Sequence, residues 1–250
     1  MPELPAPGGL LKLRVFSRVL AVPALVAMLA ITIEAETRVS LRADDGVVLV
    51  ASWYEPSRRP APAVILVHML NRTRHDWHVV ARRLAFDGIG ALAIDLRGHG
   101  ESAGARIAGG GVDYSPMVQD VKAARQFLAQ RPEVEQSRVG IAGASIGANL
   151  AVIEASTDPT ITSLALLSAS LDYRGLQIAA AARKIGARPL LLVASDDDPY
   201  ALRSARELQK IGGGVRELIV LQQVGHGASM LARTPDLVGT LVDWFRRTLL

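Results

Sequence analysis

Short apolar runs that alternate with segments of helical periodicity are the feature that most restricts the fold of this chain. The run Ala63–His68 reads AVILVH, which is typical of a strand covered on both faces. Similar runs recur along the chain, at Ala91–Asp95, Arg138–Ala142, Ser163–Leu167, Leu190–Ala194 and Arg216–Leu221. Repeated strand–helix units predict an α/β protein, in which a parallel sheet carries helices on both faces.

A hairpin and a set of helices complete the predicted pattern. Thr37–Arg42 and Val47–Tyr54 flank Asp44-Asp45-Gly46, which is a hairpin signal, so eight strands are expected in all. The predicted helices are Asp76–Phe86, Pro116–Ala129, Ile146–Ala155, Leu176–Ile185, Pro199–Ile211 and Pro235–Leu249. The stretch between the strands that end at Leu167 and begin at Leu190 leaves no room for a large lid.

Composition narrows the class of protein further. The 250 residues suit one domain with a sizeable core, and half of them are hydrophobic. The absence of cysteine excludes disulfides, thiolate catalysis and cysteine-ligated metal sites. The net charge of +4 comes mostly from scattered arginines, the pairs Arg72 with Arg74 and Arg82-Arg83 among them, without interleaved aromatic residues. We therefore expect a solvated basic surface and no nucleic-acid partner.

Residues 1–35 differ from the rest of the chain. Lys12, Arg14 and Arg18 precede an apolar run from Val19 to Ile33. A basic segment followed by a short apolar run is the pattern of a secretory signal peptide, here with a cleavage site after Ala35. An uncleaved membrane anchor is the alternative, and both predict an exported protein, periplasmic or secreted, with a folded domain over 36–250. Membrane association would then occur through the N-terminus.

The segment Gly143-Ala144-Ser145-Ile146-Gly147 is the strongest chemical signal. It lies between a predicted strand and a predicted helix, which is the context that gives a G-x-S-x-G match its meaning. Small residues around Ser145 allow a sharp turn that exposes its hydroxyl. The helix that follows directs free N–H groups at the site, and the N–H of Ile146 would bind an oxyanion.

A serine hydroxyl needs a base before it becomes a useful nucleophile. His226 is the one histidine after Ser145, and it lies in a Gly-flanked loop after the last strand. An acid that orients it is expected at the end of the preceding strand, where Asp198 is the first candidate. Asp197 and, more weakly, Asp172 stay open, and an N-terminal helix cap is the structural alternative for Asp198.

At this point the chain resembles the α/β-hydrolase family. His68-Met69 stands where the family usually carries His-Gly, and the resemblance assigns a second oxyanion N–H to Met69. The segment Asp95–Ser102 is similar to the Asp-x-Arg-Gly-His-Gly-x-Ser loop of monoacylglycerol-lipase-like and serine-aminopeptidase-like members, in which His99 would be a scaffold residue. Dienelactone-hydrolase-like members are also similar. The resemblance spans about Thr37 to Leu250.

The resemblance implies a serine esterase without a cofactor. Ser145, His226 and Asp198 would cleave a carboxylic ester of short or medium acyl chain through an acyl-enzyme. A peptidase or amide hydrolase on the same triad, a cofactor-free lyase or haloperoxidase-like enzyme, and a non-catalytic binding protein are the alternatives. No metal site is expected, since His75 and His78 lack a third ligand nearby. The oligomeric state is left open.

Overall fold

Eight strands form one sheet in the order β1-β2-β4-β3-β5-β6-β9-β10. The computed structural model describes residues 1–3, 36–103 and 113–250. The strands are β1 (Glu36–Arg42), β2 (Val48–Tyr54), β3 (Ala61–Val67), β4 (Gly90–Ile94), β5 (Val134–Ala144), β6 (Ile161–Leu167), β9 (Leu190–Ser195) and β10 (Arg216–Leu221). The six strands β4, β3, β5, β6, β9 and β10 are each parallel to their neighbours within this group. Strand β2 is antiparallel to both of its neighbours, β1 and β4. The predicted mostly parallel α/β-hydrolase sheet is confirmed.

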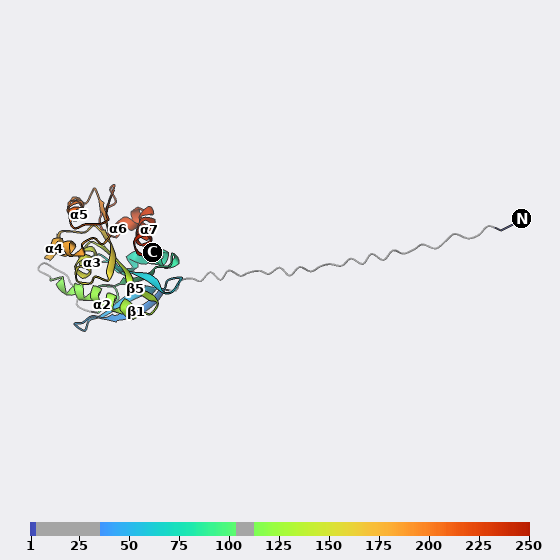
Figure 1. The fold of residues 1–250 in the computed structure, drawn as a ribbon, viewed down its shortest axis with the longest axis horizontal. Helices are drawn as coiled ribbons and strands as arrows, with labels where there is room; N and C mark the ends of the chain where they lie inside the picture. The colour runs from blue at the N-terminus through green and yellow to red at the C-terminus, as the bar shows by residue number, and fades with distance from the viewer. Residues whose placement is uncertain (4–35, 104–112) are drawn as a thin grey trace. The chain divides into compact units, whose positions relative to one another are not determined.

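Helices cover both faces of this sheet (Figure 1). They are α1 (His78–Phe86), α2 (Val118–Ala129), α3 (Ile146–Thr157), α4 (Ala179–Ile185), α5 (Pro199–Lys210), α6 (Ser229–Arg233) and α7 (Asp236–Leu249), with 3-10 turns η1 (Arg74–Trp77) and η2 (Ser115–Met117). Successive residues of β3 enter different cores. Ile65 packs in the core that contains residues of α2, α3 and α5, whereas Leu66 packs in the one that contains residues of α1 and α7. Side-chain alternation along a strand explains this division.

One predicted helix is partly wrong. The segment Leu176–Ile185 begins as β8 (Leu176–Gln177), which pairs with β7 (Asp172–Tyr173), and the helix starts only at Ala179. The cause is a tight turn at Arg174 and Gly175, both of which have positive φ. This hairpin and α4 are the elements that the described chain places between β6 and β9, and no large lid is present there.

The carboxyl ends of the parallel strands meet at one edge of the sheet. Ala144 at the end of β5 pairs with Leu167 at the end of β6, and Leu221 at the end of β10 pairs with Ser195 at the end of β9. Ligands of open α/β sheets bind outside this edge. The turn after β5 and the loops after β9 and β10 therefore converge there.

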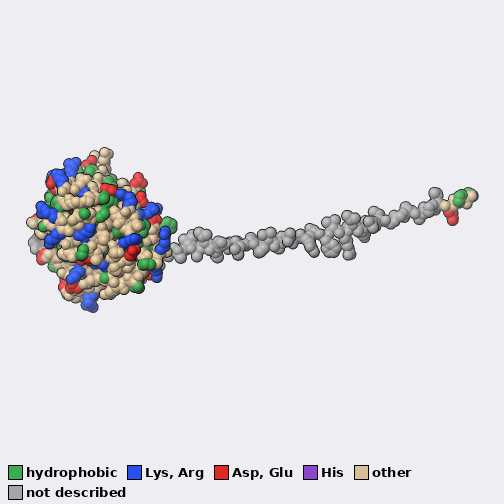
Figure 2. All heavy atoms as spheres, in the orientation of Figure 1, with side chains coloured by type: hydrophobic (Ala, Val, Ile, Leu, Met, Phe, Trp, Pro, Cys, Tyr) green, Lys and Arg blue, Asp and Glu red, His purple; other side chains and the backbone are tan. Residues whose placement is uncertain are grey.

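Charges of both signs are mixed on the face of the folded domain that Figure 2 shows. Figure 2 shows Lys and Arg side chains interspersed with Asp and Glu over the face in view. Of the predicted signal peptide or anchor, residues 4–35 lie outside the described residues. Within the described ranges, no helix combines the length and the apolarity that a membrane crossing requires.

Candidate active site

Ser145 occupies a strained turn between β5 and α3. Its φ of 52° and ψ of −118° lie in a region that residues with a side chain rarely adopt. Its N–H donates to the Leu167 carbonyl at 2.8 Å. A Cβ added to Gly143 would lie 2.2 Å from the Gly147 carbonyl oxygen, so the turn closes only because residue 143 is glycine. This is the sharp strand-to-helix turn that the sequence predicts.

Two predicted oxyanion donors lie beside this turn. Gly147 packs so tightly against the end of β3 that an added Cβ would meet the Val67 and His68 carbonyl oxygens at 2.4 and 2.6 Å. This contact holds the residue after His68, Met69, next to the start of α3. Neither the Met69 nor the Ile146 N–H donates to a protein group among the described residues. Both are therefore available to a ligand oxygen.

Asp198 and His226 form a hydrogen bond. The Nδ1 of His226 and the Oδ2 of Asp198 lie 2.5 Å apart, and the His226 side chain is 41% exposed. The other carboxylate oxygen of Asp198 accepts from the Ala201 N–H at 3.3 Å and caps α5. Asp198 thus makes both the contact with His226 and the helix cap that the sequence left as alternatives. This bond engages Nδ1 of His226, so Nε2 is the ring nitrogen left for another partner.

The other candidate acids are engaged away from His226. Asp197 accepts hydrogen bonds from the Ser195 hydroxyl and from the Gly225 N–H, and the Ser195 bond lowers its carboxyl pKa. Asp172 accepts from the Gly175 N–H at 2.8 Å within the β7–β8 turn. Asp196 accepts from the Gln223 N–H at 2.7 Å. The bonds of Asp196 and Asp197 brace the turn after β9 and the loop after β10.

The His226 loop packs against the Ser145 turn. A Cβ on Gly227 would lie 2.8 Å from the Met69 sulfur and 3.8 Å from the Ala144 Cβ. The Gly227 N–H also donates to the Ser168 hydroxyl at 2.9 Å. The Ser145 hydroxyl and His226 do not hydrogen bond to each other in this structure. Such bonds are often long in ligand-free sites and tighten when substrate binds.

Ser168 was not found by sequence reasoning. It is buried, follows β6 with a φ of 52°, and its N–H donates to the Val193 carbonyl at 2.8 Å. Its hydroxyl anchors the residue after His226, so it joins the end of β6 to the histidine loop. A serine after an apolar run carries no sequence signal for this role.

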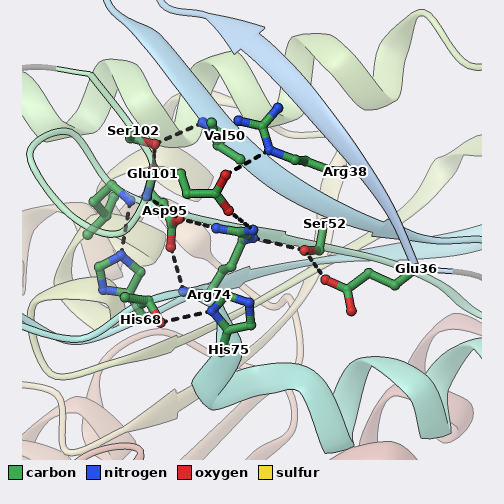
Figure 3. A network of polar contacts seen from close by, with 12 residues as sticks. Glu36, Arg38, Val50, Ser52, His68, Arg74, His75, Asp95, Glu101 and Ser102 are labelled. Carbon is green, nitrogen blue, oxygen red and sulfur yellow. Dashed lines mark hydrogen bonds and ion pairs between the residues drawn. The ribbon is translucent and has the colours of Figure 1, made fainter.

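A buried polar network supports the loop after Met69 (Figure 3). Arg74, which is 4% exposed, pairs with both Asp95 and Glu101 and donates to the Ser52 hydroxyl at 2.9 Å. The Arg74 N–H donates to Asp95 at 2.7 Å. The expectation of a solvated basic group is therefore wrong for Arg74. Its partner Asp95 lies twenty-one positions away in the sequence, so a local charge pattern could not predict this pair.

His68 and His99 belong to the scaffold behind this loop. The His68 ring is buried, accepts from the Leu96 N–H at 3.0 Å and bonds to the Met69 carbonyl at 2.7 Å. Burial lowers the pKa of His68 to about 4, so this ring is neutral near pH 7. The ring of His99 lies 5.2 Å from it, and its Nδ1 bonds to the Arg97 carbonyl. Both ring nitrogens of His68 are therefore engaged with backbone groups.

Metal-ligating side chains do not gather within the described parts of the chain. A hollow of about 900 Å³ lies between α1, α6 and α7, and its lining includes Ala228 and Ser229 but neither Ser145 nor His226.

The family profile described as "Serine aminopeptidase, S33" matches residues 58–211, more than half of the chain. The chain belongs to this α/β-hydrolase family. The matched stretch contains Ser145 and Asp198 and ends before His226. Membership supports a hydrolase enzyme. It also confirms the resemblance of the sequence to the α/β-hydrolase family. A search of curated proteins found no match.

Solved structures show the same fold at low sequence identity. A dienelactone hydrolase from Anabaena variabilis has 19% identity and a TM-score of 0.71, and the match covers 86% of this chain and 99% of that one. An esterase of Pyrococcus furiosus has 20% identity and a TM-score of 0.71, with coverage of 86% and 92%. DcsB, solved in complex with a substrate analogue, has 13% identity and a TM-score of 0.74, with coverage of 86% and 99%.

Proposed function

We propose that the protein is a serine esterase that cleaves carboxylic esters of short or medium acyl chain. The observation that carries this proposal is the 2.5 Å contact of Asp198 with His226, in a loop that packs beside the strained Ser145 turn. An orienting acid, a base and a nucleophile at one sheet edge form the combination that acyl transfer requires.

The proposed reaction proceeds in two steps. His226 Nε2 takes the proton of the Ser145 hydroxyl while the oxygen attacks the ester carbonyl carbon. The N–H groups of Met69 and Ile146 bind the tetrahedral oxyanion, and one such donor is worth about 10²–10³-fold in rate. The carbon–oxygen bond to the alcohol then breaks, and His226 returns the proton to the leaving alcohol. Water hydrolyses the acyl-enzyme by the same sequence, and Asp198 stabilises the imidazolium each time.

Two features favour small esters. The His226 side chain is 41% exposed, and the described elements between β6 and β9 form no large lid. A lipase that requires interfacial activation would need a large apolar cover. Similarity of fold to a Pyrococcus furiosus esterase agrees with this choice.

Peptide hydrolysis is the second candidate, because the matching family is described as serine aminopeptidase. Rates on p-nitrophenyl esters of graded chain length, measured beside peptide p-nitroanilides, decide between the two. We expect turnover of the short and medium esters and little release of p-nitroaniline. The reverse preference would overturn the esterase assignment and retain the triad.

The same assay tests the nucleophile and the base. Ser145→Ala and His226→Ala should each reduce turnover by about 10⁴–10⁶-fold, and the double variant should add little, because triad members act as a unit. If Ser145→Ala keeps more than about a tenth of the wild-type rate, the mechanism is wrong.

A further inference from the structure

The sheet ends on β10, an edge strand that lacks the usual protection of an edge. β10 pairs with β9 and with no other strand of the described chain. Each of its six residues is at least partly exposed, and Val220 is 43% exposed. Free edges are usually blunted by charged residues, proline or bulges, because their unpaired backbone groups attract other strands.

The outward backbone groups of β10 can be identified from its bonds to β9. The carbonyls of Val215 and Leu221 accept from β9 and from the residue after it, so these two residues face β9. Because backbone direction alternates along a strand, Leu218 and Val220 direct their N–H and C=O groups outward. The structure gives these four groups no partner within its described residues. The outward carbonyl of Arg216 is already used, since it accepts from Gln209 at 3.4 Å.

The charged side chains of β10 do not protect this edge. Arg216 is bound to the carbonyls of Gly186 and Arg188, and Glu217 is paired with Arg247 of α7 at 2.9 Å. The remaining run, Leu218–Leu221, is entirely apolar. The opposite edge differs, because β1 exposes Glu36, Arg38 and Arg42 along its length.

We propose that β10 pairs with β10 of a second copy of this chain, antiparallel and about a twofold axis at Ile219. In this register Leu218 of each copy lies opposite Val220 of the other. The free backbone groups then bond to one another, and the carbonyl held by Gln209 is not needed. Ile219 lies opposite Ile219 of the second copy, and the two form a close, non-hydrogen-bonded pair. A twofold interface uses the same surface on both partners, and an apolar strand with satisfied charges is complementary to itself.

The mass of the full chain in solution tests the pairing. Sedimentation at low and high concentration should show twice the 26.6 kDa of one chain. Val220→Lys should give a monomer with unchanged circular dichroism, because the new charge would be buried at the interface. Val79→Lys is the matched control: Val79 is 63% exposed on α1, away from the edge, and the variant should remain a dimer. A monomeric wild type, or a Val220→Lys dimer, overturns the proposal.

A crosslink tests the register, and it remains informative if Val220→Lys fails to fold. The chain has no cysteine, so Ile219→Cys introduces a single thiol. Cα atoms of a non-hydrogen-bonded antiparallel pair lie within the range that a disulfide spans. Oxidation should therefore give a covalent dimer of Ile219→Cys and leave Val79→Cys as a single chain. Equal crosslinking of both variants, or of neither, contradicts the proposed interface.

Discussion

Asp198 illustrates how one side chain can serve the fold and the site together. One oxygen caps α5 through Ala201, and the other lies 2.5 Å from His226 Nδ1. The cap fixes the carboxylate, so the histidine meets an acceptor whose position is already set. The neighbouring carboxylates of Asp196 and Asp197 instead accept hydrogen bonds from backbone N–H groups of the loop that leads to His226.

This division predicts different costs for the same substitution at three adjacent positions. Asp198→Asn should lower ester turnover by about 10⁴-fold, because asparagine favours the wrong histidine tautomer. Asp196→Asn and Asp197→Asn should each keep most of the activity. Initial rates on a p-nitrophenyl ester measure all three variants. A larger loss at Asp197 would move the orienting acid by one position.

At the scale of elements, α3 is pressed against the sheet at its first turn. A side chain on Gly147 would meet backbone oxygen atoms of Val67 and His68, which cannot move away without shifting β3. Gly239, the fourth residue of α7, differs because an added Cβ would meet nothing within 4 Å. Alanine at these two positions should therefore change the free energy of unfolding in opposite directions.

Gly147→Ala should lower the free energy of unfolding by about 1–3 kcal/mol, the usual cost of overpacking. Gly239→Ala should raise it by about 0.5–1 kcal/mol, because alanine is the better helix former and the space is open. Urea titration followed by circular dichroism measures both changes. A neutral Gly147→Ala would show that the end of β3 is not held by this contact.

A second feature of α3 predicts a pH dependence of stability. Burial, with the charge of Asp158, raises the pKa of Glu154 to about 7, above its ordinary value of 4.5. The folded state thus binds the proton more tightly than the unfolded chain. This contribution to stability is complete below the unfolded pKa and is lost as the pH rises through the folded value.

Glu154→Gln should therefore flatten the fall in the free energy of unfolding between about pH 5 and pH 8. At the alkaline end the variant should be more stable than the wild type. Glu207→Gln, at an exposed position of α5, is the control and should keep the wild-type slope. Urea titrations across this pH range provide the measurement. An unchanged slope in Glu154→Gln would mean that the carboxylate is ionised without penalty.

Periodicity could predict the elements because most strands are apolar runs between turn residues, and twelve of the fourteen predicted segments agree with the structure to within two residues at each end. The helix expected from Leu176 was partly wrong, since the turn at Arg174 depends on backbone conformation rather than on composition. The Ser145 turn carries a local motif, so it was predictable. Arg74 and Ser168 were not, because each acts through partners distant in sequence.

At the scale of the whole molecule, the N-terminal segment remains a prediction. The described strands begin at Glu36, and the buried residues of both described cores lie between Leu41 and Leu249. A chain that begins at Glu36 should therefore fold, keep full esterase activity and be more soluble than the full chain. In its native host the protein should be exported, with a mature N-terminus close to Glu36.

Intact mass of the native protein after cell fractionation checks this expectation. A protein that retains Met1 in a soluble cytoplasmic fraction contradicts export. Retention of Met1 in the membrane fraction would favour the anchor over the signal peptide.

Labelling with a fluorophosphonate probe tests the central claim most directly, because only an activated serine forms the adduct. The account predicts one adduct per chain, located on Ser145 by peptide mass analysis and absent from the Ser145→Ala variant. His226→Ala should label far more slowly, because its serine lacks the base. A folded wild-type protein that does not label, or a label that persists in Ser145→Ala, would contradict the assignment and favour a binding protein built on a hydrolase fold.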